Sequence, residues 1–405
     1  MKKNDFVKLE DIKLAAERLE GVAKLTPLEH NNTFSQFSGS SVYLKMENLQ
    51  RTGSFKIRGA YNCIQALDKE AREKGVIAAS AGNHAQGVAL GATAAGVKST
   101  IVMPEIAPLP KVSATRSYGA RVVQYGTVYD EAYEEALRLQ EEEGLTFVHA
   151  FDDMEVIAGQ GTVGLEMLQQ QPDIDAIVVP IGGGGLIAGI ATAVKTVAPH
   201  VKVYGVQASG APSCYLSRNA GVPIETAEAA TLADGIAVRK PGDITFNHIQ
   251  RYVDDVFVVK DEDIAATILL LLERSKMVVE GAGAVGLTAI LHNCVPHHDK
   301  VATILSGGNI DINFVSRIIE NGLIKAGRRV KLVTNLVDRP GELRKFITTI
   351  AEHQANIVYI YHEHAGQNLP IGHTSVEIDL ETRDNKHAEV VVASLRQAGY
   401  RVEIS

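Results

Sequence analysis

The sequence predicts an α/β protein with two parallel-sheet α/β subdomains, followed by a smaller C-terminal βαββαβ domain. Three observations predict this architecture. Short apolar, β-rich runs alternate with helical segments from Val42 to about Asn309. Several of these runs end in glycine-rich loops. The pattern changes near Ala326, after which strand-like and helical segments follow one another in a different order.

In the first part of the chain, near-continuous apolar runs are interpreted as strands because of their length and their β-branched residues. Such runs, separated by helices like 131–144, indicate parallel sheets covered on both faces. In these folds, ligands bind at the carboxyl ends of the strands, and the distinctive loops fall there. The expected strands are 42–48, 75–83, 99–105, 120–126 and 146–151, followed by AIVVPIGG, KVYGVQAS, DDVFVVKDED and VATILSGGN.

In the last 80 residues, strands and helices are expected in the order βαββαβ. The first expected helix follows Asp338, Pro340 and Gly341 and places four apolar residues on one face at helical spacing: Leu343, Phe346, Ile347 and Ile350. We therefore expect a first domain over 1–325, with a smaller subdomain at about 45–150 inserted in a larger one, and a second domain over 326–405.

Composition narrows the class of protein. The formal net charge is −8, and basic residues are interspersed, so we expect no nucleic-acid partner. The three cysteines lack CxxC spacing, which suits a reducing cytosol. The N-terminus has no apolar run typical of a signal peptide. The uncharged window 177–194 is long enough to suggest a membrane span, but its proline and four consecutive glycines argue against one. We expect a cytoplasmic protein without a membrane partner.

Lys56 lies in the stretch GSFKIRGA, among small and apolar neighbours. We expect it in the first turn of a helix covering about 57–67. Partial burial and the positive end of the helix dipole there favour a neutral amine. A neutral lysine amine attacks carbonyls, as a Schiff base with pyridoxal phosphate (PLP) requires. These eight residues alone fit a solvated surface lysine better, but further motifs favour the Schiff base.

Three other motifs end expected strands. In SAGNHAQG, backbone amides with Ser80 and Asn83 make a pocket for a carboxylate; the alternative is that Asn83 only caps a helix. In PIGGGGLIAG, consecutive glycines let their amides surround one phosphate at a helix start. In LSGGN, Ser306 places a hydroxyl where it meets a ring nitrogen, or the motif is an ordinary glycine turn.

Two further interpretations are weaker. EGAGAVG spells GxGxxG, but the following strand ends at Ser306 rather than at the acidic residue typical of a dinucleotide site. His292, Cys294, His297 and His298 resemble metal ligands in composition but lie in a proline-broken segment. We interpret that segment as a solvated loop and expect no metal site.

Together, GSFKIRGA, SAGNHAQG, PIGGGGLIAG and ILSGGN resemble the fold-type II PLP enzymes, which share the tryptophan synthase β-like architecture. The specific resemblance, over about 8–327, is to the threonine/serine dehydratases, or threonine ammonia-lyases. The tail resembles an ACT domain, with DRPGEL as its best local match. The resemblance implies a catalytic domain and a regulatory ACT-like domain. It also implies elimination of water and ammonia from L-threonine to give 2-oxobutanoate, and activity on L-serine that gives pyruvate.

The resemblance also assigns roles to residues of this chain. Lys56 would carry PLP and act as catalytic base, Asn83 would bond the ring hydroxyl, and Ser306 would contact the pyridine nitrogen. Unlike a carboxylate, a serine there does not favour a protonated ring, so β-elimination is favoured over transamination. The phosphate would be held by Gly182, Gly183, Gly184 and Gly185, and the substrate carboxylate would lie near Ser80, Asn83 and His84.

Related activities of the same fold differ from this chain at a few positions. Serine racemases have a second serine in the asparagine loop where this chain has Ala81, and acidic metal ligands where it has Gln207 and Ser213. We therefore expect elimination without racemisation. The sequence is also compatible with a β-replacement PLP enzyme, or with a non-catalytic amino-acid-binding regulator, although Lys56 argues against the regulator. We also expect a homodimer or homotetramer. The ACT-like domain either binds a small effector, such as a branched-chain amino acid or an adenine nucleotide, or serves only for dimerisation or packing.

Overall fold

The computed structural model describes residues 6–364 and 369–404 of the chain. The chain divides into two compact units, Met1–Ile310 and Asp311–Ser405. The boundary between these units, after Ile310, lies earlier in the chain than the boundary between 325 and 326 that the sequence suggested. The difference is helix α14 (Ile312–Lys325), which groups with the second unit and leads through a short turn into β11 (Arg329–Val337).

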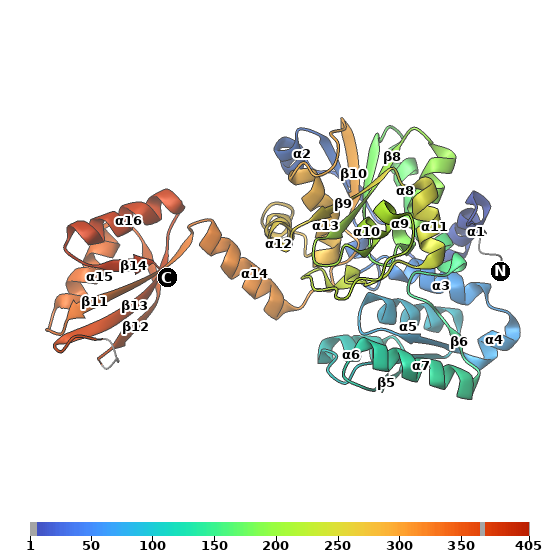
Figure 1. The fold of residues 1–405 in the computed structure, drawn as a ribbon, viewed down its shortest axis with the longest axis horizontal. Coiled ribbons are helices and arrows are strands. Elements are labelled where there is room, and N and C mark those ends of the chain that lie inside the picture. Colours follow the sequence, from blue (N-terminus) through green and yellow to red (C-terminus); the bar gives the residue numbers. More distant parts are fainter. Residues whose placement is uncertain (1–5, 365–368, 405) are drawn as a thin grey trace. The chain divides into compact units, whose positions relative to one another are not determined.

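The smaller subdomain of the first unit is a parallel four-stranded sheet in the order β5-β4-β3-β6. Helix α5 lies on one face and α7 on the other (Figure 1), and their apolar side chains bury the central strands β3 and β4, whereas β5 and β6 at the edges are only partly buried. The strands are β3 (Val76–Ala79), β4 (Ser99–Met103), β5 (Arg121–Gln124) and β6 (Thr146–Phe147), and the helices are α4 (Lys69–Lys74), α5 (Asn83–Ala95), α6 (Leu109–Ser117) and α7 (Tyr129–Glu143).

The larger subdomain has a six-stranded sheet in the order β1-β2-β10-β7-β8-β9, parallel except for the edge strand β1. Because β2 pairs with β10 of this sheet, the smaller subdomain is an insertion between β2 and β7. The strands are β1 (Leu28–His30), β2 (Ser41–Lys45), β7 (Ala176–Pro180), β8 (Lys202–Ala208), β9 (Asp255–Val259) and β10 (Lys300–Ile304).

Helices and short helical turns surround this sheet. The window 177–194, whose length suggested a membrane span, forms β7, the glycine loop and most of α9. Among the described residues, no helix is long and apolar enough to cross a membrane. The elements are α1 (Leu9–Leu19), α2 (Asn32–Ser38), η1 (Glu47–Leu49), α3 (Lys56–Ala66), α8 (Met154–Gln170), α9 (Gly185–Val197), α10 (Ser213–Ala220), η2 (Asp234–Ile236), α11 (Asp243–Tyr252), α12 (Asp261–Leu270), η3 (Leu271–Ser275) and α13 (Gly281–Leu291).

Helices α3, α8 and α9 pack backbone against backbone through glycines. A Cβ at Gly189 would lie 2.3 Å from the carbonyl oxygen of Ile157, and one at Gly159 would lie 2.6 Å from that of Arg58. A real Cβ does not approach so closely, so these glycines permit the contact. The start of α3, which carries Lys56, is thereby fixed against the helices of the larger subdomain.

The second unit contains an antiparallel sheet in the order β12-β13-β11-β14. Its elements follow one another as βαββαβ, as predicted, and Phe346 and Ile350 of the first helix are buried. Part of the expected loop 366–372 lies outside the described residues. After β11 come α15 (Glu342–Glu352), β12 (Asn356–Glu363), β13 (His373–Glu381), α16 (Asn385–Gln397) and β14 (Val402–Ile404).

Candidate active site

A cavity of about 950 Å³ lies in the first unit, at the carboxyl ends of strands from both sheets. All nine residues singled out in the sequence line it, although they come from four separate stretches. They are Lys56, Ser80, Asn83, His84, Gly182, Gly183, Gly184, Gly185 and Ser306.

Lys56 is the first residue of α3, as the sequence predicted. Its Nζ donates a hydrogen bond to the carbonyl oxygen of Ala150 at 2.9 Å. Burial lowers the pKa of Lys56 from 10.5 to about 8, against the opposing effect of the Glu280 carboxylate. The cavity therefore contains an amine with a much larger neutral fraction at neutral pH than an ordinary lysine has.

The glycine loop lies between β7 and α9. Within the part of the chain that the structure describes, the backbone N–H groups from Gly182 to Leu186 have no protein acceptor. These donors open onto the cavity at a helix N-terminus, where the helix dipole favours an anion. Gly183 also leaves room for Phe151, because a Cβ there would lie 2.3 Å from its ring.

Asn83 starts α5, but the N-cap is Gly82, so the alternative that Asn83 only caps the helix is wrong. Its Nδ2 donates to Oε1 of Glu280 at 2.7 Å, and its Oδ1 accepts from Nδ2 of Asn309 at 2.7 Å. The Asn83 side chain is therefore hydrogen-bonded on both sides, to Glu280 and to Asn309, which come from two other parts of the chain.

His84 is buried, and its Nε2 lies 2.8 Å from the carbonyl oxygen of Val148. Burial, followed by the nearby Lys56 charge, lowers the pKa of His84 to about 3. The imidazole is therefore neutral, and its Nε2–H donates to the backbone. Ser80 accepts a hydrogen bond from the N–H of Gly82 at its Oγ.

Ser306 follows β10 and lies beside the start of α3, where its carbonyl accepts a hydrogen bond from the N–H of Phe55 at 3.1 Å. Sequence reasoning missed Glu280, a buried residue that also lines the cavity. Burial and the nearby Asp234 raise the pKa of Glu280 to about 7, against the effect of the Asn83 hydrogen bond. Its signal was present in EGAGAVG, which was considered only as a dinucleotide pattern.

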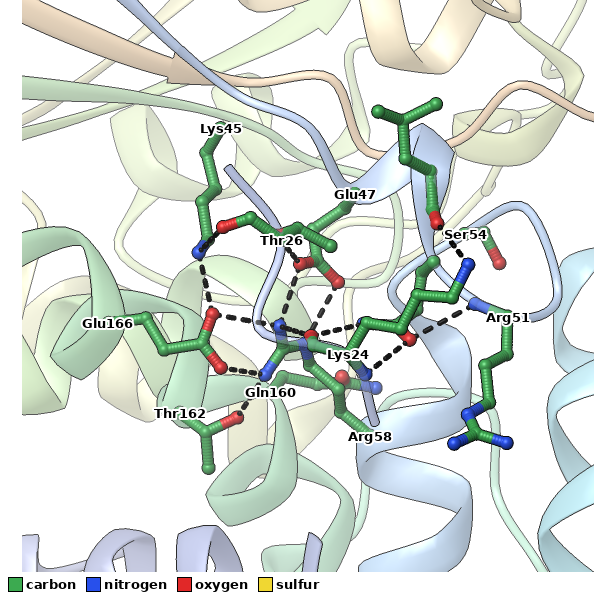
Figure 2. A network of polar contacts seen from close by, with 12 residues as sticks. Lys24, Thr26, Lys45, Glu47, Arg51, Ser54, Arg58, Gln160, Thr162 and Glu166 are labelled. Carbon is green, nitrogen blue, oxygen red and sulfur yellow. Dashed lines mark hydrogen bonds and ion pairs between the residues drawn. The ribbon is translucent and has the colours of Figure 1, made fainter. Parts of the chain in front are cut away.

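A buried ion network supports the start of α3 (Figure 2). Arg58 contacts two carboxylates, Glu47 at 2.7 Å and Glu166 at 2.6 Å, and Lys45 contacts Glu166 at 2.6 Å. Figure 2 shows the Glu166 carboxylate between the two cations. The network balances two positive against two negative groups and connects β2, η1, α3 and α8. In the sequence, the feature that pointed to this network was Arg58, a charged residue two positions after Lys56 in the otherwise small and apolar stretch GSFKIRGA.

A family model described as "Pyridoxal-phosphate dependent enzyme" matches residues 19–307. The chain belongs to this family. It is 50% identical to L-threonine ammonia-lyase of Thermotoga maritima over 399 residues, which cover 98% of this chain and 100% of that protein.

Solved structures agree. The processed form of threonine deaminase isoform 2 from Solanum lycopersicum has a TM-score of 0.74 and 40% identity, over 77% of this chain and 86% of that one. Maize serine racemase has a TM-score of 0.75 and 35% identity, over 79% of this chain and 99% of that one. The fold-type II assignment made from four motifs is confirmed.

The residues of the cavity fit PLP, which carries an aldehyde, a phosphate and a pyridine ring with a hydroxyl. The largely neutral amine of Lys56 suits the aldehyde, and the N–H groups of the glycine loop suit the phosphate. Asn83 has one amide hydrogen beyond the one that it donates to Glu280. The donor set therefore matches the chemistry of the cofactor that this family uses.

The side chains of Gln207 and Ser213, two positions at which the sequence suggested a difference from serine racemases, form hydrogen bonds with backbone groups of the chain. Nε2 of Gln207 donates to the carbonyl oxygen of Ile181, and its Oε1 accepts from the N–H of Tyr215. Oγ of Ser213 donates to the carbonyl oxygen of Val238. An amide that already bridges two backbone groups replaces the acidic ligand expected in a racemase.

Proposed function

We propose that this protein is a PLP-dependent threonine ammonia-lyase that converts L-threonine to 2-oxobutanoate and ammonia, and L-serine to pyruvate and ammonia. The observation that carries the proposal is the buried amine of Lys56 in one cavity with the glycine loop. The relationship to an L-threonine ammonia-lyase over 98% of this chain supports it.

When bonded to the substrate amine, PLP would accept the electron pair that remains on Cα after its proton is removed. We propose that Lys56 bonds the cofactor in the resting enzyme and that its Nζ, once free, takes the Cα proton as general base. An amine with a pKa near 8 suits this role because it is basic, yet substantially neutral, close to neutral pH.

The remaining residues of the site would bind and orient the cofactor and the substrate. We propose that the N–H groups of Gly182 to Gly185 bind the cofactor phosphate and that Asn83 donates to the ring oxygen. The Ser80 hydroxyl and the backbone N–H groups of Asn83 and His84 would receive the substrate carboxylate, because the ring N–H of His84 already donates to Val148. Ser306, an uncharged partner for the ring nitrogen, favours elimination over transamination because it does not stabilise a protonated ring.

We further propose that the second unit is an ACT-like regulatory domain that binds a small effector, either an amino acid or a nucleotide, and that the enzyme is a cytoplasmic homodimer or homotetramer. The βαββαβ order of the second unit supports the first part. The net charge and the absence of a membrane-spanning helix among the described residues are consistent with the location.

The test is steady-state turnover of L-threonine and L-serine by the purified, PLP-loaded enzyme, without added thiol or sulfide. We expect 2-oxobutanoate from threonine, pyruvate from serine, and no appreciable D-serine. A β-substituted amino acid formed with added thiol or sulfide, and no ketoacid without it, would favour a β-replacement enzyme. Appreciable D-serine would favour a racemase, and a PLP-binding protein that turns over neither substrate would contradict the proposal.

A further inference from the structure

Asn309 closes the LSGGN motif, yet neither the motif itself nor the proposed chemistry gives it a role. Its Nδ2 donates twice, to the carbonyl oxygen of Thr52 at 2.8 Å and to Oδ1 of Asn83 at 2.7 Å. Gly53 makes room for it, because a Cβ there would lie 2.6 Å from Oδ1 of Asn309. Asn309 therefore links the loop before Lys56 to the asparagine loop.

The contacts of Asn83 fix which way its amide faces. Its oxygen meets the N–H of Asn309, and its nitrogen meets the carboxylate of Glu280. If the amide turned over, its nitrogen would face another donor and its oxygen would face a carboxylate. The contact between the two amide nitrogens of Asn83 and Asn309 would be repulsive whether or not Glu280 is ionised, so only the observed orientation satisfies every group.

Glu280 is itself held in place. Its N–H donates to the carbonyl oxygen of Gly307, one of the glycines before Asn309, and it precedes the first residue of α13. The charged groups that face it are Asp234, Lys111 and Lys56. Asn83 is therefore held from two sides by residues anchored to the same glycine turn.

We propose that Asn309 and Glu280 are positioning residues, which orient the Asn83 amide so that its remaining N–H points to the ring oxygen of PLP. This inference rests on the proposed role of Asn83. A donated N–H stabilises the ionised ring hydroxyl and thereby sets the protonation state of the bound cofactor. Asn309 touches neither cofactor nor substrate in this arrangement and acts only through Asn83.

The test is a pH titration of the absorption of the bound cofactor, together with equilibrium binding of PLP to the apoenzyme. Asn309→Leu removes the donor, and Asn309→Asp replaces it with an acceptor that draws the Asn83 amide into the reversed orientation. In both variants we expect the ring hydroxyl of the bound cofactor to ionise less readily, so that visible absorption decreases in favour of the near-ultraviolet. The apparent pKa of that hydroxyl should rise by roughly half a unit to one unit, and the Kd for PLP should rise by roughly three- to tenfold.

Asn48→Ala is the matched control. Asn48 is a buried asparagine that packs against Gly308 of the same turn and donates to the carbonyl oxygen of Val278, without contact to Asn83. Its loss should lower the thermal stability while leaving the titration unchanged. Thermal denaturation checks that each variant folds, and Asn309→Asp keeps the side-chain shape if Asn309→Leu does not fold.

Asn83→Ala separates this inference from the function. If Asn83→Ala shifts the titration while both Asn309 variants match the wild type, the positioning role is wrong and the role of Asn83 stands. If Asn83→Ala also leaves the titration unchanged, Asn83 does not contact the ring, and the inference is wrong with it. Threonine turnover by the wild type reports on the function in either case.

Discussion

At the scale of single residues, Lys56 gives a pH prediction. Burial lowers its pKa to about 8, so its neutral fraction rises as the pH increases through that value. We expect the rate at which the apoenzyme captures PLP to rise with pH and to level off above about 8. Glu280→Gln should lower the midpoint, because the Glu280 carboxylate raises the pKa of Lys56.

Stopped-flow growth of the visible band measures this capture, with Lys56→Ala as the blank. A midpoint near 10.5, the ordinary value for lysine, would show that the amine is solvated and would contradict the structure.

At the scale of elements, the ion network around Arg58 connects α3 to β2, η1 and α8. Arg58→Met would leave the carboxylate of Glu47, which is fully buried, with the Thr26 hydroxyl as its only remaining hydrogen-bonding partner among the described residues. Removing one partner of a buried ion pair leaves an uncompensated charge. We expect the free energy of unfolding to fall by about 3–5 kcal/mol.

Urea denaturation followed by circular dichroism measures this loss. Arg138→Met is the matched control, because Arg138 also contacts two carboxylates, Glu135 and Glu142, but its own side chain is 51% exposed, against 1% for Arg58. Solvent screens those pairs, so this substitution should change stability little. Equal effects of the two substitutions would show that the network around Arg58 contributes no more than a surface pair.

How far the sequence predicts the fold differs between elements. The parallel strands of both sheets are predicted because buried parallel strands are continuous apolar runs, as in Val76–Ala79, but the short antiparallel edge strand β1 is not. The sequence placed the boundary after α14 because the pattern changes only near Ala326, whereas the contacts of the structure group α14 with the second unit. The roles of Glu280 and Arg58 were missed because their partners are brought together only by the fold: Glu280 accepts a hydrogen bond from Asn83, and Arg58 pairs with Glu166 as well as with Glu47.

At the scale of the whole molecule, the described residues that line the cavity all lie between Phe55 and Ser306. Deleting residues 330–405 should therefore preserve PLP binding and threonine turnover and should abolish any response to amino-acid or nucleotide effectors. Turnover with and without each effector, for the full chain and the truncated one, measures this. An effector response that survives the deletion would refute the regulatory role of the second unit.

The most direct test of the proposed chemistry is to locate the lysine that bonds the cofactor. Borohydride reduction of the PLP-loaded enzyme makes that bond permanent, and peptide mass spectrometry then identifies the modified residue. We predict a single phosphopyridoxyl group on Lys56. A group on another lysine, or none on the peptide containing Lys56, would contradict it.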